Sequence, residues 1–317
     1  LFDGFGTRSE VDRQKARFQS ATHTAEQNAE ELVLQASQAY LTVLREQDLY
    51  ALAKETLENH RSIYDQTELR ENSGVGSQAD VEQITGRLAL ANTNLVTTEA
   101  NLLDAATKFK SVVGIQPVTK EMHYPELAIV LPASLASAVS DAEAKNPALL
   151  SAAADVEAGK AQYEASKSTF WPRVTLEAEH NYSDNVQGIS GDEESTLVAL
   201  RMKYKLYSGG EDTARKKQTA VLMNEAMEIR NDKQRKVVEA LGYYWSAIDA
   251  INRQMPYLET HVEAAGATRD AYNEQYDIGR RTLLDLLNTE NEVVDARRSL
   301  IKARYDQVLS QLQLLSV

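Results

Sequence analysis

The chain contains neither glycine nor proline between Gly6 and Gly74. Because these two residues are the strongest interrupters of local structure, the stretch Thr7–Ser73 can form one helix of roughly 65 residues, about 100 Å long. A helix of this length is typical of a coiled coil or a helical array and argues against a compact enzyme domain. Five of the six prolines instead fall in the middle third, where the chain must turn: Pro117, Pro125, Pro132, Pro147 and Pro172.

Apolar and small residues recur every seven positions in the helical stretches. The clearest series consists of Val81, Leu88, Leu95, Leu102 and Phe109. A second series runs beside it three residues later, which is the a/d pattern of a coiled-coil seam. Similar series cover Ala29 to Tyr64 and Leu287 to Leu315. The sequence therefore predicts a mainly α protein built from long coiled-coil hairpins.

The stretch 171–207 departs from this period and alternates with a period of two, which predicts two strands. Between them the polar, acidic segment 183–195 is expected to be a loop. One face of the hairpin is apolar and holds Val174, Leu176, Ala178, Val198, Leu200, Met202, Tyr204 and Leu206. The other face is charged and holds Arg173, Glu177, Glu179, Arg201, Lys203 and Lys205.

A two-stranded hairpin is marginal in water by itself, so this one must join further strands or another layer. Two arrangements stay open at this point. In a soluble protein the apolar face would pack on the helices, whereas in an outer-membrane barrel it would face lipid. No run of about 18 apolar residues occurs, so a transmembrane helix is not expected.

An internal repeat relates the two ends of the chain. A shift of 205 residues carries the start Leu1–Gly4 onto Leu206–Gly209, Gly74 onto Gly279, and Asp80 onto Asp285. The predicted segments are a strand end (1–6), a helical hairpin (7–113), an equatorial linker (114–132), a helix (133–170), the β-hairpin (171–207) and a second helical hairpin (208–317) that repeats 3–112. Because only the second copy has a strand hairpin before its glycine turn, we expect about 70 further residues and any signal peptide upstream of Leu1.

Composition excludes several classes of function. The formal net charge of −13 disfavours a nucleic-acid binder, because phosphate recognition depends on Lys and Arg. The absence of cysteine removes disulfides, thiol nucleophiles and thiolate metal ligands. The five histidines form no HExxH pair, and no GxSxG or phosphate-loop motif is present. We therefore expect no enzyme, no catalytic residues, no cofactor and no metal.

Four motifs, in this order along the chain, resemble the TolC family of outer-membrane channel-tunnels. They are the helix start that extends from Leu131-Pro132 to Asn146–Leu149, the strand entry Trp171–Val174, the turn Leu206–Gly210 followed by Ala214-Arg215, and the segment Tyr276–Leu287. The resemblance implies a homotrimer in the outer membrane of a Gram-negative bacterium. Each protomer would give four strands to a 12-stranded β-barrel, and the helices would form an α-barrel tunnel through the periplasm.

The implied function is an export duct for type I protein secretion or tripartite drug efflux. Its implied partners are a periplasmic adaptor, an inner-membrane ABC or proton-driven transporter, and outer-membrane lipid on the apolar face of the hairpin. The loop 183–195 would lie outside the cell. One alternative is a soluble coiled-coil scaffold without transport activity, which leaves the hairpin and the repeat unexplained. A periplasmic adaptor would have one helical hairpin flanked by small β-domains.

The resemblance also implies an aperture at the periplasmic turns. Tyr276 and Arg281 would hold the second hairpin against its neighbours, with Asp80 as the acceptor for Tyr276. Asp285 would contribute to a ring of three carboxylates, which repel one another and attract cations. The family often carries a second acidic ring three residues later, where this chain has Asn288. Asp80 and Asp285 can alternatively be first-turn acids that the helix dipole favours.

Glycine-rich turns mark the remaining candidate sites. The tips of the two hairpins are expected to contact the adaptor, the alternative being plain turn residues: Gly74, Val75, Gly76, Gly279 and Arg280. Three further glycines are expected to form the strand-to-helix turns: Gly4, Gly209 and Gly210.

Overall fold

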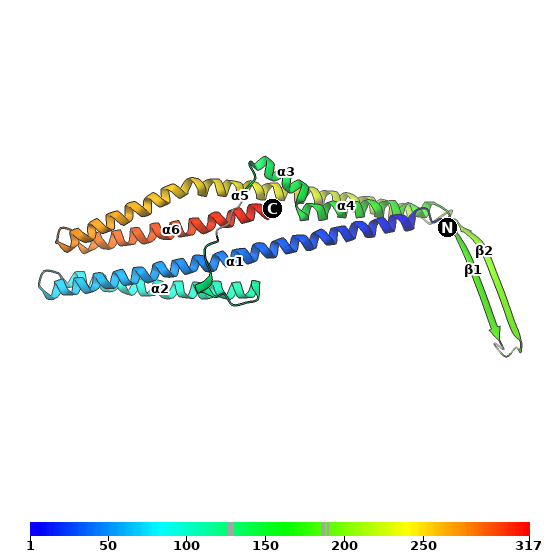
Figure 1. The fold of residues 1–317 in the computed structure, drawn as a ribbon. Helices are drawn as coiled ribbons and strands as arrows, with labels where there is room; N and C mark the ends of the chain where they lie inside the picture. The colour runs from blue at the N-terminus through cyan, green and yellow to red at the C-terminus, as the bar shows by residue number, and fades with distance from the viewer. Residues whose placement is uncertain (126–129, 185–187, 189) are drawn as a thin grey trace. The chain divides into compact units, whose positions relative to one another are not determined.

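The computed structural model describes residues 1–125, 130–184, 188 and 190–317. The chain divides into two units, the first comprising Leu1–Asn28 and Val139–Val238 and the second Ala29–Ala138 and Glu239–Val317. The elements in chain order (Figure 1) are α1 (Gly6–Asn72), α2 (Gln78–Val113), η1 (Thr119–Glu121), α3 (Leu135–Lys145), α4 (Pro147–Ser166), η2 (Ser168–Phe170), β1 (Arg173–Asp184), β2 (Asp192–Lys203), α5 (Glu211–Asp277) and α6 (Leu283–Leu315).

The ends of the long helices are consistent with the internal repeat. α1 and α5 are each 67 residues long, and a shift of 205 carries both ends of α1 onto the ends of α5. The same shift carries the first residue of α2 onto the first residue of α6. The glycine-free stretch therefore forms the single helix that its sequence predicts.

The stretch 133–170 is not one helix, as the sequence predicted, but two helices and a 3₁₀ turn. The break lies at Asn146, which is extended and accepts a hydrogen bond from the Leu149 N–H at 3.0 Å. Pro147 follows at the first helical position, where its missing N–H costs nothing. The residue that precedes a proline is restricted to extended conformations. α3 therefore ends before Asn146, and α4 begins at Pro147.

The β-hairpin of the first unit has the predicted faces. In the antiparallel register Val174 lies opposite Met202, and Leu176 lies opposite Leu200. On the other face an Arg201 nitrogen lies 2.8 Å from a Glu177 carboxylate oxygen. The pairing continues to Asp184 and Asp192, so both ends of the predicted loop 183–195 are strand. Residues 185–187 and 189 lie outside the described residues.

The start of the chain lies alongside this hairpin. Phe2 and Val174 exchange two backbone hydrogen bonds, of 3.0 and 2.7 Å, in an antiparallel bridge. The predicted strand end at 1–6 is therefore shorter than expected, because α1 already begins at Gly6. The Asp3 carboxylate accepts a hydrogen bond from the Thr7 N–H at 2.7 Å and so caps this helix.

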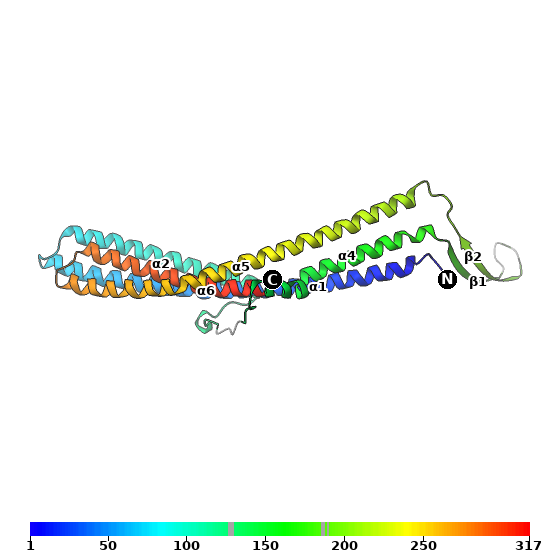
Figure 2. The same cartoon turned by 90° about the horizontal axis from the view of Figure 1, so that it is seen from above.

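Within the first unit, α4 lies between the first part of α1 and the first part of α5 (Figure 2). Hydroxyl contacts join these helices, with Ser151 3.2 Å from Ser20 and Ser166 3.0 Å from Thr219. Small residues allow this close packing. An added Cβ on Gly159 would lie 3.4 Å from the Cα of Met223.

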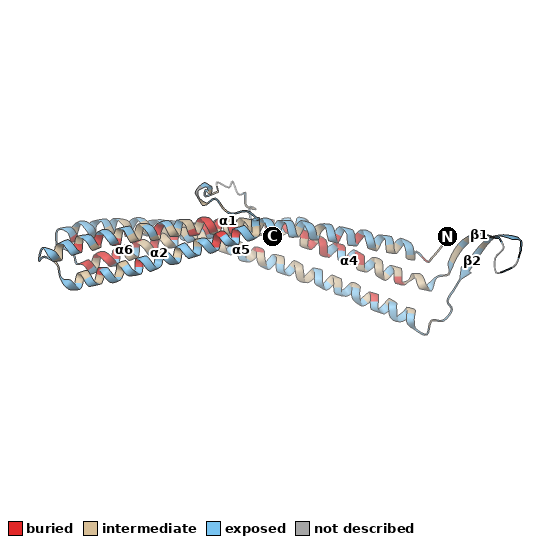
Figure 3. Cartoon of the chain, turned by 90° about the horizontal axis from the view of Figure 1, so that it is seen from below, coloured by how far each residue is buried: buried red, intermediate tan, exposed pale blue. Residues whose placement is uncertain are grey.

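The second unit holds the coiled-coil seams, whose buried residues are marked in red in Figure 3. On α2 the buried positions include Ile84, Ala91, Ala105 and Phe109, as the heptad pattern predicts. Part of the linker is tied to α1, because the hydroxyl of Tyr40 donates to the His123 carbonyl at 2.8 Å.

Candidate functional site

The two helical turns of the second unit, α1–α2 and α5–α6, are built alike. Gly74 and Gly279 both adopt left-handed conformations, with φ of 74° and 72°. This geometry ends a helix and favours glycine, which has no Cβ to strain it. A Cβ on Gly76 would lie 2.9 Å from the Glu71 nitrogen. These three glycines are therefore required by the turns themselves.

The strand-to-helix turns also need their glycines. Gly4, Gly209 and Gly210 have φ of 69°, 62° and 88°. At Gly4 an added Cβ would lie only 2.6 Å from the Ser168 carbonyl oxygen. The prediction that these residues form turns is consistent with the backbone, which a side chain would strain at all three positions.

Asp285 and Asp80 close the first turns of α6 and α2. Asp285 forms a capping box with Thr282, in which each side chain bonds the other residue's backbone N–H at 3.2 Å. Ser77 caps α2 in a similar way and donates its hydroxyl to Asp80 at 2.8 Å. The hydrogen bonds from Thr282 hold the pKa of Asp285 below its usual value, and Arg281 assists. Asp80 and Asp285 therefore both act as acids in the first turn of a helix, which is the alternative role that the sequence analysis gave them.

Tyr276 makes a buried contact between the two hairpins. Its hydroxyl lies 3.2 Å from the Thr67 hydroxyl, which itself donates to the Ile63 carbonyl at 2.7 Å. Because a threonine hydroxyl has only one proton, the Tyr276 hydroxyl must be the donor to Thr67. Within the protomer the partner of Tyr276 is therefore Thr67 on α1, and not the predicted Asp80, whose carboxylate is engaged in its own helix cap.

Arg70 makes a second contact with Tyr276 that the sequence reasoning missed. Its guanidinium lies over the aromatic ring, 4.7 Å from the centroid, and one nitrogen donates to the Tyr276 carbonyl at 2.8 Å. A cation at the last carbonyls of a helix is favoured by the helix dipole. The internal repeat distinguishes this residue, because the position of Arg70 is occupied by the uncharged Gln275 in the second copy. This difference could have indicated a contact that only the first hairpin makes.

Arg281 does not reach the first hairpin within this protomer. Its guanidinium lies over the ring of Tyr272, 4.2 Å from the centroid, and its Nε donates to Gln275 at 3.1 Å. These contacts stay within the α5–α6 turn. A link from Arg281 to a neighbouring protomer remains a prediction.

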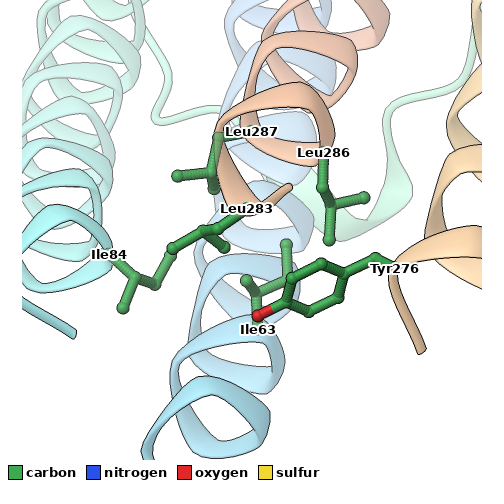
Figure 4. Close-up of a cluster of buried hydrophobic side chains, with 6 residues drawn as sticks. All are labelled: Ile63, Ile84, Tyr276, Leu283, Leu286 and Leu287. Carbon is green, nitrogen blue, oxygen red and sulfur yellow. The ribbon is translucent and has the colours of Figure 1, made fainter. Parts of the chain in front are cut away.

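An apolar cluster lies beside Tyr276 and brings four helices together (Figure 4). It consists of Ile63 from α1, Ile84 from α2, Tyr276 from α5, and Leu283, Leu286 and Leu287 from α6. Leu286 and Leu287 are completely buried. The first turn of α6 is thus the main anchor of the second hairpin at this end of the unit.

Among the residues that the structure describes, no group of three or more His, Cys, Asp or Glu side chains could hold a metal ion. In the same described ranges, no helix is both long enough and apolar enough to cross a membrane.

The sequence pattern of the family described as Outer membrane efflux protein matches residues 1–114 and 138–317. The chain therefore belongs to this family of outer-membrane transport proteins, which is the TolC family that its motifs resemble. Its place is the outer membrane of a Gram-negative bacterium, and its function is efflux through an outer-membrane channel. A soluble scaffold is not favoured.

Relatives and solved structures agree with this assignment. The chain is 26% identical to the outer membrane efflux protein BepC of Brucella suis, over all of this chain and 69% of BepC. It is also 26% identical to the outer membrane protein TolC of Vibrio cholerae, over 95% of this chain and 70% of TolC. The fold matches the outer-membrane channel OprN with a TM-score of 0.87, at 20% identity, over 98% of this chain and 72% of OprN.

Proposed function

We propose that this chain assembles as a homotrimer into an export duct, which carries substrate from an inner-membrane transporter and its adaptor across the periplasm and the outer membrane. The observation that carries the proposal is the β-hairpin. Its apolar face is exposed in the single chain, where Val198, Leu200 and Met202 are each 69% exposed. A strand pair with such a face needs further strands and an apolar environment, which a shared 12-stranded barrel in lipid supplies.

A second face of α2 supports the assembly of several protomers. It carries small and apolar residues at heptad spacing, all exposed in the single chain and none charged: Gly86, Ala89, Thr93, Val96, Ala100, Leu103 and Thr107. The Thr93 and Thr107 hydroxyls donate to the carbonyls of Ala89 and Leu103, so both threonines have satisfied hydroxyls. This face suits a helix of the next protomer in an α-barrel, because small residues let helices approach closely.

The turns of the second unit would form the periplasmic aperture. Tyr276, Thr67 and Arg70 hold the second hairpin against α1 within a protomer, and Arg281 would add a link to the neighbouring protomer. In a trimer the three Asp285 carboxylates would form a cation-attracting ring. The exposed apolar tips support adaptor contact at Gly74, Val75, Gly76, Gly279 and Arg280, since Val75 is 72% exposed and Ile278 66%.

The names of two relatives describe the export of different cargoes. One is an alkaline protease secretion protein, AprF, and another is a pyoverdine export protein, OpmQ, both from Pseudomonas aeruginosa. Cargo choice would rest with the inner-membrane transporter, because the duct presents generic polar surfaces. Copurification with an ABC transporter would indicate protein secretion, and copurification with a proton-driven pump would indicate drug efflux.

The test of the duct uses the full-length protein purified in detergent. We expect a trimeric mass, loss of solubility without detergent, and discrete conductance steps in planar lipid bilayers. A monodisperse, detergent-independent protein that produces no conductance would contradict the proposal. A trimer without conductance would separate assembly from transport.

A further inference from the structure

A cluster of four charges joins α1 to the second hairpin in the second unit. Glu55 lies on α1, Arg269 on α5, and Glu290 and Arg297 on α6. Arg297 donates to the Glu55 carboxylate at 2.6 Å. The Nε of Arg269 lies 3.9 Å from a Glu290 oxygen. We call these four residues the charge cluster.

The charge cluster lies on the same faces as the aperture contacts. Arg269 precedes Tyr276 by seven residues on α5, so both side chains lie on one face of the helix. Glu290 precedes Arg297 by the same interval on α6. Glu290 lies one heptad after the buried Leu283. The residue one heptad after Leu286 is the buried Val293, so the charges follow the row of Leu283 beside a row that stays apolar.

The repeat shows that these charges are not needed to build a helical hairpin. In the other copy, the positions that correspond to Glu55, Arg269, Glu290 and Arg297 are all uncharged: Thr260, Tyr64, Thr85 and Asn92. Both copies form hairpins with matching helix starts. The charge cluster is thus a feature of the contact between the hairpins and not of either hairpin alone.

The two carboxylates lie in opposite environments. The Glu55 side chain is 45% exposed, and the hydrogen bond from Arg297 lowers its pKa. Glu290 is only 6% exposed, and burial raises its pKa. Arg269, Asn59 and His60 oppose this rise without cancelling it, and Asp270 adds to it. Ionised Glu55 is therefore favoured by the contact, whereas ionised Glu290 is disfavoured by it.

We infer that the charge cluster sets the resting position of the second hairpin, with the Glu55–Arg297 pair holding the hairpin against α1 and buried Glu290 pushing it away. Separation of the helices breaks the short ion pair but returns Glu290 to water. Because the ion pair favours the contact and the burial of Glu290 disfavours it, the helices separate more readily here than at an apolar seam. The ion pair still fixes the position of α6 along α1. This inference rests on the proposed function, because it makes Glu55 and Glu290 positioning residues of the proposed aperture.

The test is single-channel conductance of the trimer at neutral pH. We expect Glu55→Gln to raise the open-state population about twofold, the effect of losing one partly exposed ion pair, and Glu290→Gln to lower it by a similar factor. Glu58→Gln, at an exposed carboxylate on the same helix, is the matched control and should change nothing. The exchange Glu55→Arg with Arg297→Glu should restore the wild-type value.

A pH series separates positioning from a structural role. The raised pKa of Glu290 means that its protonated form favours the closed contact, so the open population should increase as pH rises through that pKa. Glu290→Gln should remove this dependence. If both glutamine variants change the channel in the same direction, or neither changes it while the trimer resists SDS as before, the inference is overturned.

A distance measurement keeps the inference testable if the protein forms no channel. The chain has no cysteine, so spin labels can be placed at Arg61→Cys on α1 and Asn273→Cys on α5, both exposed. We expect Glu55→Gln to widen the distance distribution between the labels and Glu290→Gln to narrow it. If the distances shift as expected but no conductance is seen, the proposed duct is wrong and the inference about the charge cluster stands. If the distances do not change, the inference about the charge cluster is wrong.

Discussion

The two helical turns of the second unit share their construction and differ in their contacts. Both use a left-handed glycine and a hydroxyl N-cap followed by an aspartate, at Ser77 and Asp80 in one and Thr282 and Asp285 in the other. The residues at the contact differ, since Tyr276 corresponds to Glu71 and Leu287 to Glu82. The shared positions therefore form the turn, and the differing positions determine which surface packs against the other hairpin.

The largest difference between the turns is in burial at the start of the second helix. Leu287 is fully buried, whereas its counterpart Glu82 is exposed. We expect Leu287→Ala to destabilise the protein by about 2–5 kcal/mol, because it removes buried methyl groups and leaves a cavity. Thermal unfolding followed by circular dichroism at fixed protein concentration measures this loss. Glu82→Ala is the matched control and should stay within about 0.5 kcal/mol of the wild type; equal losses would mean that the two turns pack alike.

The next effect concerns the hydrogen bond that joins the hairpins. Tyr276→Phe removes the hydrogen-bond donor to Thr67 and should lower the free energy of unfolding by about 1 kcal/mol. It should also raise the open-state population in single-channel recordings. Thr67→Val should have a similar effect, and the double variant should cost less than the sum of the two, because both remove one interaction. Additive losses would show that the 3.2 Å contact contributes nothing.

The shared caps should respond equally in both turns. Thr282→Ala and Ser77→Ala each remove a side-chain acceptor for a backbone N–H, at a cost of about 1 kcal/mol. We expect nearly equal shifts in the thermal midpoint, with conductance changing only in the Thr282 variant, whose helix carries the apolar anchor. A conductance change in Ser77→Ala of the same size would show that the first turn moves as well.

The fold could be predicted where one residue type settles the local geometry. The absence of glycine and proline defined α1, and the alternation of Val174, Leu176 and Ala178 defined the faces of the hairpin. The break at Asn146 was missed because an Asn-Pro pair is compatible with two structures, the start of a helix and an interruption within a longer helical segment. The Thr67 and Arg70 contacts were missed because they depend on the tertiary packing of α1 against α5, which periodicity along one helix does not contain.

The smallest effect is the pH dependence of the α6 cap. The Thr282 hydrogen bonds lower the pKa of Asp285 in the folded protein, so Asp285 stabilises the fold above its ordinary pKa. This contribution is lost as pH falls through the lowered value, because the protonated carboxyl accepts the hydrogen bonds from the N–H and the hydroxyl of Thr282 less well. Asp285→Asn should flatten stability against pH in that acidic range. In the trimer the same substitution should reduce cation selectivity, measured as the reversal potential in a salt gradient. A flattened stability curve with unchanged selectivity would leave Asp285 as a helix cap alone, like Asp80.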